Sequence, residues 1–175
     1  GLALLDLWRP EAGVQRVLDG YGKGEEPLPV YKIADLEGVA VAGGRVFLPA
    51  VGRHELLVVD PGDWKEVARV PLRGQPVFAV ARPDGRQIWV NFAHPTNDVV
   101  QVIDVPSLRV IDTLRPGKAV MHLEFTPRGD KVWVSARDDD QVVVYDPRTR
   151  REIARLAAEK PSGVLFAARA QRIGY

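Results

Sequence analysis

The chain has 175 residues with 24 Lys and Arg against 23 Asp and Glu, a formal net charge of +1 at pH 7. This balance argues against a nucleic-acid-binding surface, and the lack of cysteine excludes disulfides, thiolate metal sites and a covalent c-type haem in this chain. No apolar run approaches the length of a membrane-spanning helix and no signal peptide opens the sequence, so we expect no membrane span.

Two short apolar segments begin the chain. Residues 2–6 and 15–18 resemble the third and fourth strands of a four-stranded unit, so we assign residues 1–18 to a half unit. A segment rich in glycine and proline follows, which predicts a long loop over residues 19–35. The three glycines at its start do not indicate a phosphate site, because no strand–loop–helix unit surrounds them and an acidic pair follows them.

The middle of the chain repeats itself. The segment 83–90 (PDGRQIWV) precedes the similar segment 127–134 (PRGDKVWV) by 44 residues, and residues 44–48 belong to a weaker copy. Turn residues followed by β-branched and aromatic residues indicate strands, and a period of about 40–45 residues with four strands is typical of a propeller blade. We therefore predict an all-β fold, a β-propeller of four-stranded blades with no helix longer than two turns. The whole blades are assigned to residues 36–72, 76–115 and 119–157.

The last part of the chain resembles the beginning of a further blade. We assign residues 161–175 to this half blade, with its first strand at 164–169. Three whole blades and two half blades can close a small four-bladed ring or belong to a larger propeller. We favour the larger propeller, because a domain rarely begins within a blade.

Polar residues gather on one predicted face of the blades. In a propeller, the loop from the second to the third strand lies on the same face as the segment that leads into each first strand. The candidates on this face are Arg53, His54, His94, His122, Arg137, Ser162 and Gly163. All three histidines of the chain are among them, although solvated loop histidines give the same spacing. The spacing shows no catalytic triad, carboxylate pair or zinc motif, so catalytic residues are unknown and no metal site is predicted.

Three aromatic residues recur within the repeat. Trp89 and Trp133 occupy equivalent positions, and Phe47 belongs to the weaker copy. We interpret all three as packing between blades and not as contacts to a ligand.

Four segments carry a resemblance to a known family. They are AVGRHELLVVD (50–60), GQPVFAVARPDGRQIWVNFA (74–93), EFTPRGDKVWVSARD (124–138) and KPSGVLFAARAQRIG (160–174). These segments closely resemble the C-terminal half of the NirF family of haem d1 biosynthesis proteins, which is related to the d1 domain of cytochrome cd1 nitrite reductase. The resemblance implies about half of an eight-bladed d1-type propeller, which holds a tetrapyrrole across one end of its channel.

The resemblance also implies positions in the pocket. His122 matches a position whose polar side chain approaches the macrocycle. Ser162 and Gly163 match a Thr-Gly pair that lines the pocket, and Phe166 follows close behind. His94 matches an aromatic pocket position.

Arg137 stands where the reductase has a tryptophan that packs on the ring. An arginine there can bind a tetrapyrrole carboxylate through two hydrogen bonds. The alternative is an ion pair with one of the three aspartates at 138–140. The iron-ligating and reacting residues of the family lie largely outside the half that this chain resembles, so we assign no catalytic residue.

The resemblance implies a late haem d1 maturation protein of the periplasm. Such a protein binds haem d1 or a d1-type precursor for modification or for delivery to cytochrome cd1 nitrite reductase, together with other maturation proteins. Two alternatives stay open. One is a cofactor-free propeller that serves as a protein-interaction scaffold, and the other is the d1 domain of a nitrite reductase-like enzyme. Histidines on one face favour the tetrapyrrole-binding maturation protein over the scaffold, and whether a reaction is catalysed is left open.

Overall fold

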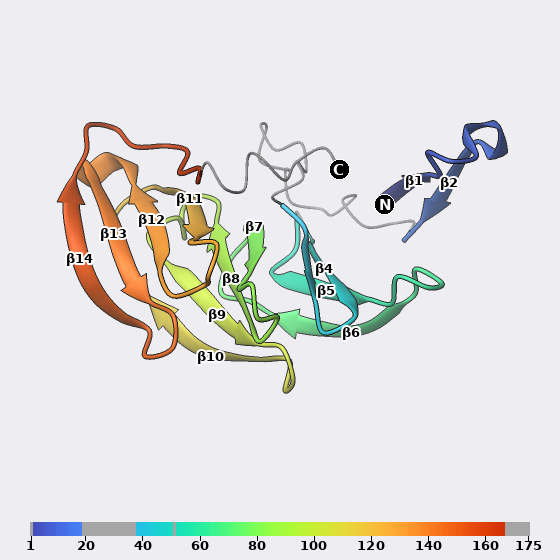
Figure 1. The fold of residues 1–175 in the computed structure, drawn as a ribbon, viewed down its shortest axis with the longest axis horizontal. Helices are drawn as coiled ribbons and strands as arrows, with labels where there is room; N and C mark the ends of the chain where they lie inside the picture. The colour runs from blue at the N-terminus through green and yellow to red at the C-terminus, as the bar shows by residue number, and fades with distance from the viewer. Residues whose placement is uncertain (1, 19–37, 51, 167–175) are drawn as a thin grey trace.

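The computed structural model describes residues 2–18, 38–50 and 52–166, which form an almost entirely β structure (Figure 1). Three antiparallel four-stranded sheets follow one another along the chain, preceded by a two-stranded hairpin. The prediction of an all-β chain of four-stranded blades is confirmed. The expected loop at 19–35 and residues 167–175 of the last half blade lie outside the described residues.

The strands have the following bounds. The hairpin is β1 (Leu2–Leu5) and β2 (Val14–Val17), and the first sheet is β3 (Ala40–Ala42), β4 (Arg45–Pro49), β5 (Glu55–Val59) and β6 (Glu66–Pro71). The second sheet is β7 (Pro76–Ala81), β8 (Gln87–Phe92), β9 (Val100–Asp104) and β10 (Arg109–Leu114). The third sheet is β11 (Val120–Phe125), β12 (Val132–Ala136), β13 (Gln141–Asp146) and β14 (Arg151–Ala157).

Helical structure in the described ranges is limited to two 3-10 segments of three residues, η1 (Pro10–Ala12) and η2 (Arg137–Asp139). Neither has the length and apolar character that a membrane crossing requires.

The three sheets are arranged side by side in an arc (Figure 1). Strands β7 and β11 lie on its inner side, and β6, β10 and β14 form its outer edge. In each sheet the strands pair in chain order from the innermost to the outermost. This is the arrangement of propeller blades, which bury their faces by stacking on their neighbours.

Aromatic and branched side chains fill the spaces between the sheets. Phe47 packs with Ile88 and Phe92 of the second sheet, and it is fully buried. Trp89 packs with residues of the third sheet and has no exposed surface. Its ring meets that of Phe125 edge to face, with 5.8 Å between the centroids. The interpretation of Phe47 and Trp89 as packing between blades is therefore confirmed.

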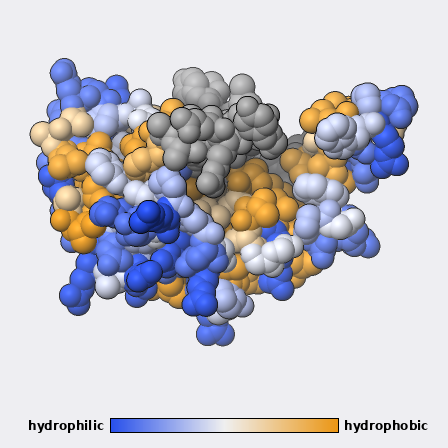
Figure 2. Space-filling model, viewed as in Figure 1, coloured by the Kyte–Doolittle hydropathy of each residue, from blue (hydrophilic) through white to orange (hydrophobic). Residues whose placement is uncertain are grey.

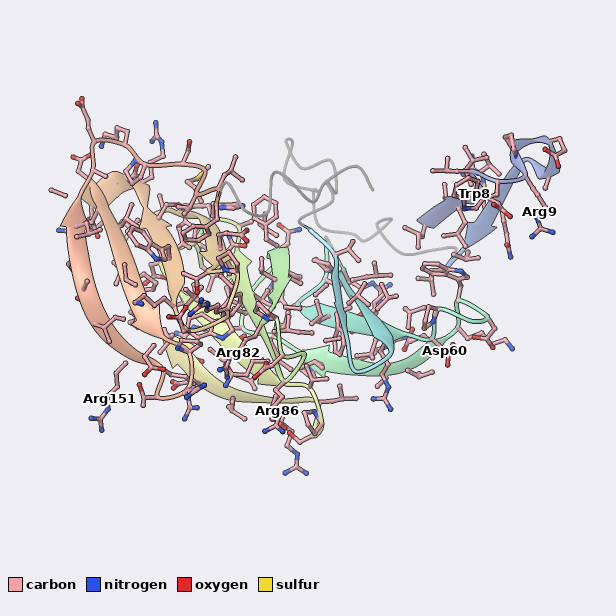
Figure 3. All side chains as sticks on the ribbon, in the orientation of Figure 1. Trp8, Arg9, Asp60, Arg82, Arg86 and Arg151 are labelled. Atoms are coloured by element: carbon pink, nitrogen blue, oxygen red, sulfur yellow. The ribbon has the colours of Figure 1, made fainter. Side chains whose placement is uncertain are left out.

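Polar side chains link the second and third sheets both at the turns that follow their inner strands and at their outer strands. The guanidinium of Arg82 donates from Nε to the carbonyl oxygen of Gly129 at 3.2 Å, from the turn between β7 and β8 (Figure 3). Arg150 donates from Nε to Oδ2 of Asp112 at 2.9 Å. In the space-filling view, apolar surface is also visible on the inner side of the arc, over β4 and β5 (Figure 2).

Tyr145 provides a test of this packing at high pH. It lies in β13 against Trp89, and burial, followed by the nearby Glu152 carboxylate, raises its pKa from 10.0 to about 12. Between these two values the unfolded chain loses the phenolic proton while the folded chain keeps it, so stability should fall as pH rises through this window. A pKa shift of this size lowers the free energy of unfolding by at most about 2–3 kcal/mol once both states have lost the proton.

We expect Tyr145→Phe to make the stability less dependent on pH between about 10 and 12, because phenylalanine has no proton to lose. Urea unfolding at a series of pH values measures this, with the parent chain as the reference for all other groups that titrate there. Parallel curves for the two proteins would contradict the burial of the phenol.

Candidate functional site

A bulge interrupts the innermost strand of the second and third sheets at the same place. In β11 the register with β12 shifts by one residue between Val120 and Leu123, so Met121 and His122 together face Ser135. In β7 the register with β8 shifts in the same way between Pro76 and Ala79. A bulge leaves one residue outside the ladder of backbone hydrogen bonds and redirects its side chain. His122 is thus presented by a repeated feature of the fold.

A polar side chain on the second strand satisfies the amide that each bulge leaves unpaired. Asn91 accepts from the Phe78 amide at 2.9 Å through Oδ1, and Ser135 accepts from the His122 amide at 2.9 Å through Oγ. The same side chains also reach the following unit of the chain. The amide of Asn91 donates to the carbonyl oxygen of Val120 at 3.1 Å, and the hydroxyl of Ser135 lies 2.9 Å from the carbonyl oxygen of Ser162. Ser135 therefore bridges two predicted pocket segments.

The segment 161–166 lies where the first strand of a further blade would begin. It forms no strand in the structure, in contrast to the expectation for residues 164–166. Its contacts nevertheless repeat those of β11. Ser135 contacts the Ser162 carbonyl, just as Asn91 contacts the carbonyl groups of Val120 and Met121. The ring of Trp133 meets that of Phe166 edge to face at 6.1 Å, just as the ring of Trp89 meets that of Phe125. In the described part of the chain, this segment pairs with no strand.

His122 is buried, with 6% of its surface exposed. Its ring meets Phe78 edge to face at 5.7 Å, and its Nδ1 accepts a hydrogen bond from the Val164 amide at 3.2 Å. His122 is the second residue of the bulge in β11, and Phe78 is the second residue of the bulge in β7, so the two residues occupy equivalent positions in neighbouring sheets. A phenyl ring fills this position in the preceding sheet, so the imidazole adds polar chemistry at this place in the blade, and it uses part of that chemistry to bind the Val164 amide.

The indole nitrogen of Trp133 is a second buried polar group of the third sheet. Trp133 is half-buried, whereas Trp89 is fully buried, so the expected packing between blades is only partly formed at Trp133. Trp89 donates from Nε1 to Gln87, but Lys131 stands two residues before Trp133, and the buried Nε1 of Trp133 has no hydrogen-bond partner in the described residues. An orphaned buried donor suits a site that receives an acceptor from outside this part of the chain.

The remaining candidates lie in loops between second and third strands. Arg53 and His54 are exposed in the loop from β4 to β5, and His94 is exposed after β8. Arg137 is exposed in η2, where its guanidinium pairs with Asp138 at 3.1 Å. This pair is the alternative named for Arg137 from the sequence, and a contact to a ligand carboxylate stays a prediction.

These loops lie beside the segments that lead into or leave the sheets. The carbonyl oxygen of His54 accepts from the Leu72 amide at 2.8 Å, and the Arg137 amide donates to the Ala119 carbonyl at 3.0 Å. Asp139 accepts from the Lys118 amide at 2.8 Å, and Asp140 accepts from the Lys160 amide at 2.9 Å. The hydrogen bond from the Lys160 amide lowers the pKa of Asp140. The aspartates of this loop therefore anchor neighbouring segments, and no group of three potential metal ligands occurs in the residues that the structure describes.

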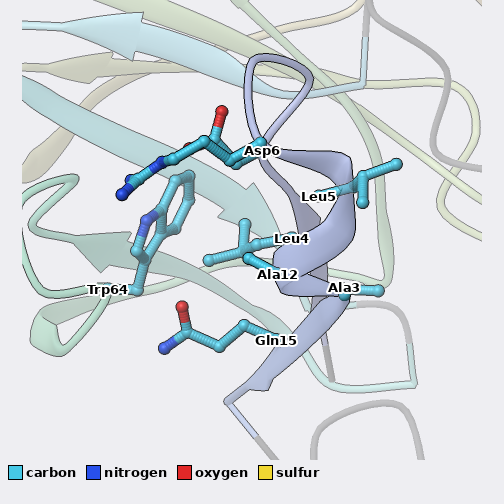
Figure 4. Close-up of a pocket in the computed structure, with 9 residues that line it drawn as sticks. Ala3, Leu4, Leu5, Asp6, Ala12, Gln15 and Trp64 are labelled. Carbon is cyan, nitrogen blue, oxygen red and sulfur yellow. The ribbon is translucent and has the colours of Figure 1, made fainter.

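A cleft of about 620 Å³ lies elsewhere, between the β1–β2 hairpin and Trp64 (Figure 4). Leu4, Asp6, Arg9 and Gln15 line it, and Arg9 and Asp6 pair with each other at 2.9 Å. None of the predicted site residues lines this cleft. The candidate site is instead the cluster of His122, Ser135, Ser162, Val164 and Phe166, to which Gly163 belongs by position.

Ser135 and the Trp133 indole N–H were not predicted as parts of the site. A signal for Ser135 exists in the repeat, because Asn91 and Ser135 both follow a Trp-Val pair. The donor set fits a macrocycle that carries oxygen acceptors, since the third sheet bears a buried imidazole and a buried indole N–H that has no partner in the described residues. These residues could hold such a group by hydrogen bonds.

Comparison with known proteins assigns the chain to a family. Residues 3–170 match the family described as the Cytochrome D1 heme domain. The chain belongs to this family. The NirF proteins of Stutzerimonas stutzeri and Pseudomonas aeruginosa are 54% and 56% identical to this chain over 174 residues. The matches cover 99% of this chain but 44% of each relative, so the chain spans less than half of their length. The resemblance to the NirF family seen in the sequence is confirmed.

Two solved structures have a similar fold. The dihydro-heme d1 dehydrogenase NirN in complex with DHE superposes with a TM-score of 0.64 and 31% identity, over 71% of this chain and 28% of NirN. The β-propeller domain of Cps50 (Swd1) from Myceliophteria thermophila superposes with a TM-score of 0.60 and 13% identity, over 71% of this chain and 43% of that domain. The second likeness shows the propeller fold alone.

Proposed function

We propose that the protein acts in late haem d1 maturation in the periplasm, where it binds haem d1 or a d1-type precursor for modification or delivery to cytochrome cd1 nitrite reductase. The observation that carries the proposal is the buried His122 on the bulge of β11, where the preceding sheet has Phe78. A polar group in a position that the fold can fill with a phenyl ring indicates recognition of a ligand. The family and the similar NirN, a dihydro-heme d1 dehydrogenase, support a d1-type tetrapyrrole as that ligand.

In this proposal the chain binds and orients the macrocycle, and the macrocycle supplies whatever redox chemistry follows. The cluster around His122 donates hydrogen bonds, and Phe166 offers an aromatic surface beside Trp133. Arg53, His54, His94 and Arg137 contribute polar and cationic groups from the loops of the same face. Ser162 and Gly163 line the site with backbone, and a Cβ at Gly163 would meet no heavy atom within 4 Å.

Titration of the intact protein with haem d1 tests this function. We expect a change in the Soret region that saturates with one macrocycle per protein. A spectrum that remains the sum of the two components would overturn the proposal and would favour a cofactor-free scaffold.

Arg137 provides a separate test of anion recognition. Its guanidinium already holds one carboxylate, that of Asp138, at an exposed site where such a pair is worth about 0–1 kcal/mol. A carboxylate of a bound tetrapyrrole, partly shielded from water, can replace Asp138 with a gain of roughly 1.5–3 kcal/mol. We therefore expect Arg137→Leu to weaken haem d1 binding about ten- to a hundredfold, and Arg137→Lys to restore part of it.

The matched control for Arg137 is Asp138→Asn, which removes the competing carboxylate and should leave binding equal or tighter. The titration is run at low and high salt, because an ionic contact weakens as salt screens it. If both Arg137 variants bind like the parent protein, Arg137 serves only the surface pair with Asp138.

A further inference from the structure

One face of the blades is formed by the turns that join the first strand to the second and the third strand to the fourth in each sheet. We call it the turn face. Because neighbouring strands are antiparallel, it lies at the opposite end of the strands from the loops that carry His54, His94 and Arg137. Arg86 and Arg151 come from two of its turns, and both lie on the lower side of Figure 3. Every turn has a cation within it or at the first residue of the next strand, and these cations include Arg45, Lys65, Arg86, Arg109, Arg128, Lys131 and Arg151.

Five of these cations are exposed arginines without a partner. Their guanidinium groups form no hydrogen bond or ion pair with residues 2–18, 38–50 or 52–166, and they are Arg45, Arg86, Arg109, Arg128 and Arg151. The lysines of the turn face differ, since each pairs with an aspartate of its own turn, at 2.9 Å for Lys65 and 3.2 Å for Lys131. On the opposite face, Arg115 and Arg137 also pair with aspartates. Unpaired arginine is therefore concentrated on the turn face.

The aspartates of the turn face bind their own turns instead of these arginines. Asp60, Asp104 and Asp146 stand at the end of the third strand of each sheet, and each accepts from a backbone amide two or three residues later, at 2.7–3.0 Å. Asp84 accepts in the same way from the Arg86 amide, at 3.1 Å. An aspartate that binds the backbone two or three residues on fixes the conformation of a turn. The arginines are thus displayed by ordered turns, which reduces the entropy that a binding partner must overcome.

The composition of the turn face selects the kind of partner. None of the large apolar side chains that are exposed in the described residues lies in these turns, although a surface that inserts into lipid presents such side chains. The aspartates among the arginines would repel a continuous polyanion such as a nucleic acid. Arginine binds a carboxylate through two parallel hydrogen bonds, and it is enriched at protein–protein interfaces, where lysine is depleted. These features favour a protein surface that carries carboxylates.

We propose that the turn face is a docking surface for a second protein with a carboxylate-rich surface, which the five unpaired arginines bind. The proposal does not depend on the tetrapyrrole ligand proposed above. Docking at this end of the strands leaves the loops of the opposite face uncovered, so a partner and a ligand can be bound together. Because the contacts are exposed and charged, they favour rapid and transient association that salt weakens.

Poly-L-glutamate, added to the intact protein without tetrapyrrole, is the probe for this surface. The informative variant is Arg86→Gln with Arg151→Gln. The matched control is Arg16→Gln with Arg73→Gln, which removes two exposed arginines that lie outside the turn face and also lack a partner in the described ranges. The two variants have the same net charge. We expect the turn-face variant to bind poly-L-glutamate about three- to thirtyfold more weakly at low salt, while the control retains most of the affinity.

Three results would overturn the proposal. One is a lack of binding by the parent protein at low salt. Another is equal weakening in the two variants, because net charge would then account for the attraction. The third is tighter binding of the parent protein to vesicles of phosphatidylcholine and phosphatidylglycerol, or to duplex DNA, with a loss confined to the turn-face variant.

Haem d1 separates this surface from the proposed ligand site. Saturating haem d1 should leave the affinity for poly-L-glutamate unchanged, because the two sites lie at opposite ends of the strands. Competition between haem d1 and poly-L-glutamate would overturn the assignment of the docking surface to the turn face. If the protein does not bind haem d1, the proposed function fails, while the comparison of the two arginine variants still decides the docking surface.

Discussion

Replacing Trp89 by alanine is expected to lower the free energy of unfolding by about 3–5 kcal/mol. The indole is fully buried between the second and third sheets, where it contacts the rings of Phe125 and Tyr145. Its removal leaves a cavity at the interface of two blades, and the surrounding strands are held in place by their own ladders, so they cannot collapse into it. Urea unfolding of the 175-residue chain, followed by circular dichroism, measures the change.

Trp133→Ala is the matched control, since Trp133 occupies the equivalent position in the next sheet. Its indole is half-buried and contacts the ring of Phe166. We expect the free energy of unfolding to fall by about 1–3 kcal/mol, because this half-buried indole contributes less buried apolar surface than that of Trp89. Equal losses for the two variants would contradict the difference in burial that the structure shows.

Asn91→Ala is expected to cost roughly 2–6 kcal/mol of stability. The side chain is 1% exposed and binds both the amide that the bulge in β7 leaves unpaired and a carbonyl of β11. Alanine leaves a buried donor and a buried acceptor without partners, and each such group costs about 1–3 kcal/mol. The same unfolding experiment gives the value, with the native β content checked at zero denaturant.

Asn91→Ser tests the reason for this loss. In the next sheet a serine, Ser135, makes the corresponding pair of contacts with the His122 amide and the Ser162 carbonyl. A serine at position 91 should therefore retain more stability than an alanine. Equal stability of the two variants would show that side-chain volume, and not hydrogen bonding, accounts for the effect.

The blade pattern could be predicted from the sequence because its causes are local. Turn residues at 83–86 and 127–130 are each followed by one polar residue and a short apolar run, and the repeat of this pattern indicates the period of a blade. The burial of Phe47 and Trp89 follows from the same periodicity, since alternate residues of a strand face the same neighbour. The one-face placement of the polar loops also comes from the order of strands within a blade.

The site needed the tertiary structure because its decisive contacts join residues that are far apart in the chain. Val164 binds the ring of His122 from 42 residues away, and Ser135 reaches Ser162 from 27 residues away. The bulge that presents His122 is a shift of register between two strands, and a strand pattern with a period of two does not reveal where such a shift occurs. For Arg137, the sequence offered two partners of equal chemistry, and the structure places its guanidinium on Asp138. Composition and periodicity thus determined the blades. The contact between the His122 ring and the Val164 amide and the pairing of Arg137 with Asp138 were decided by the tertiary structure.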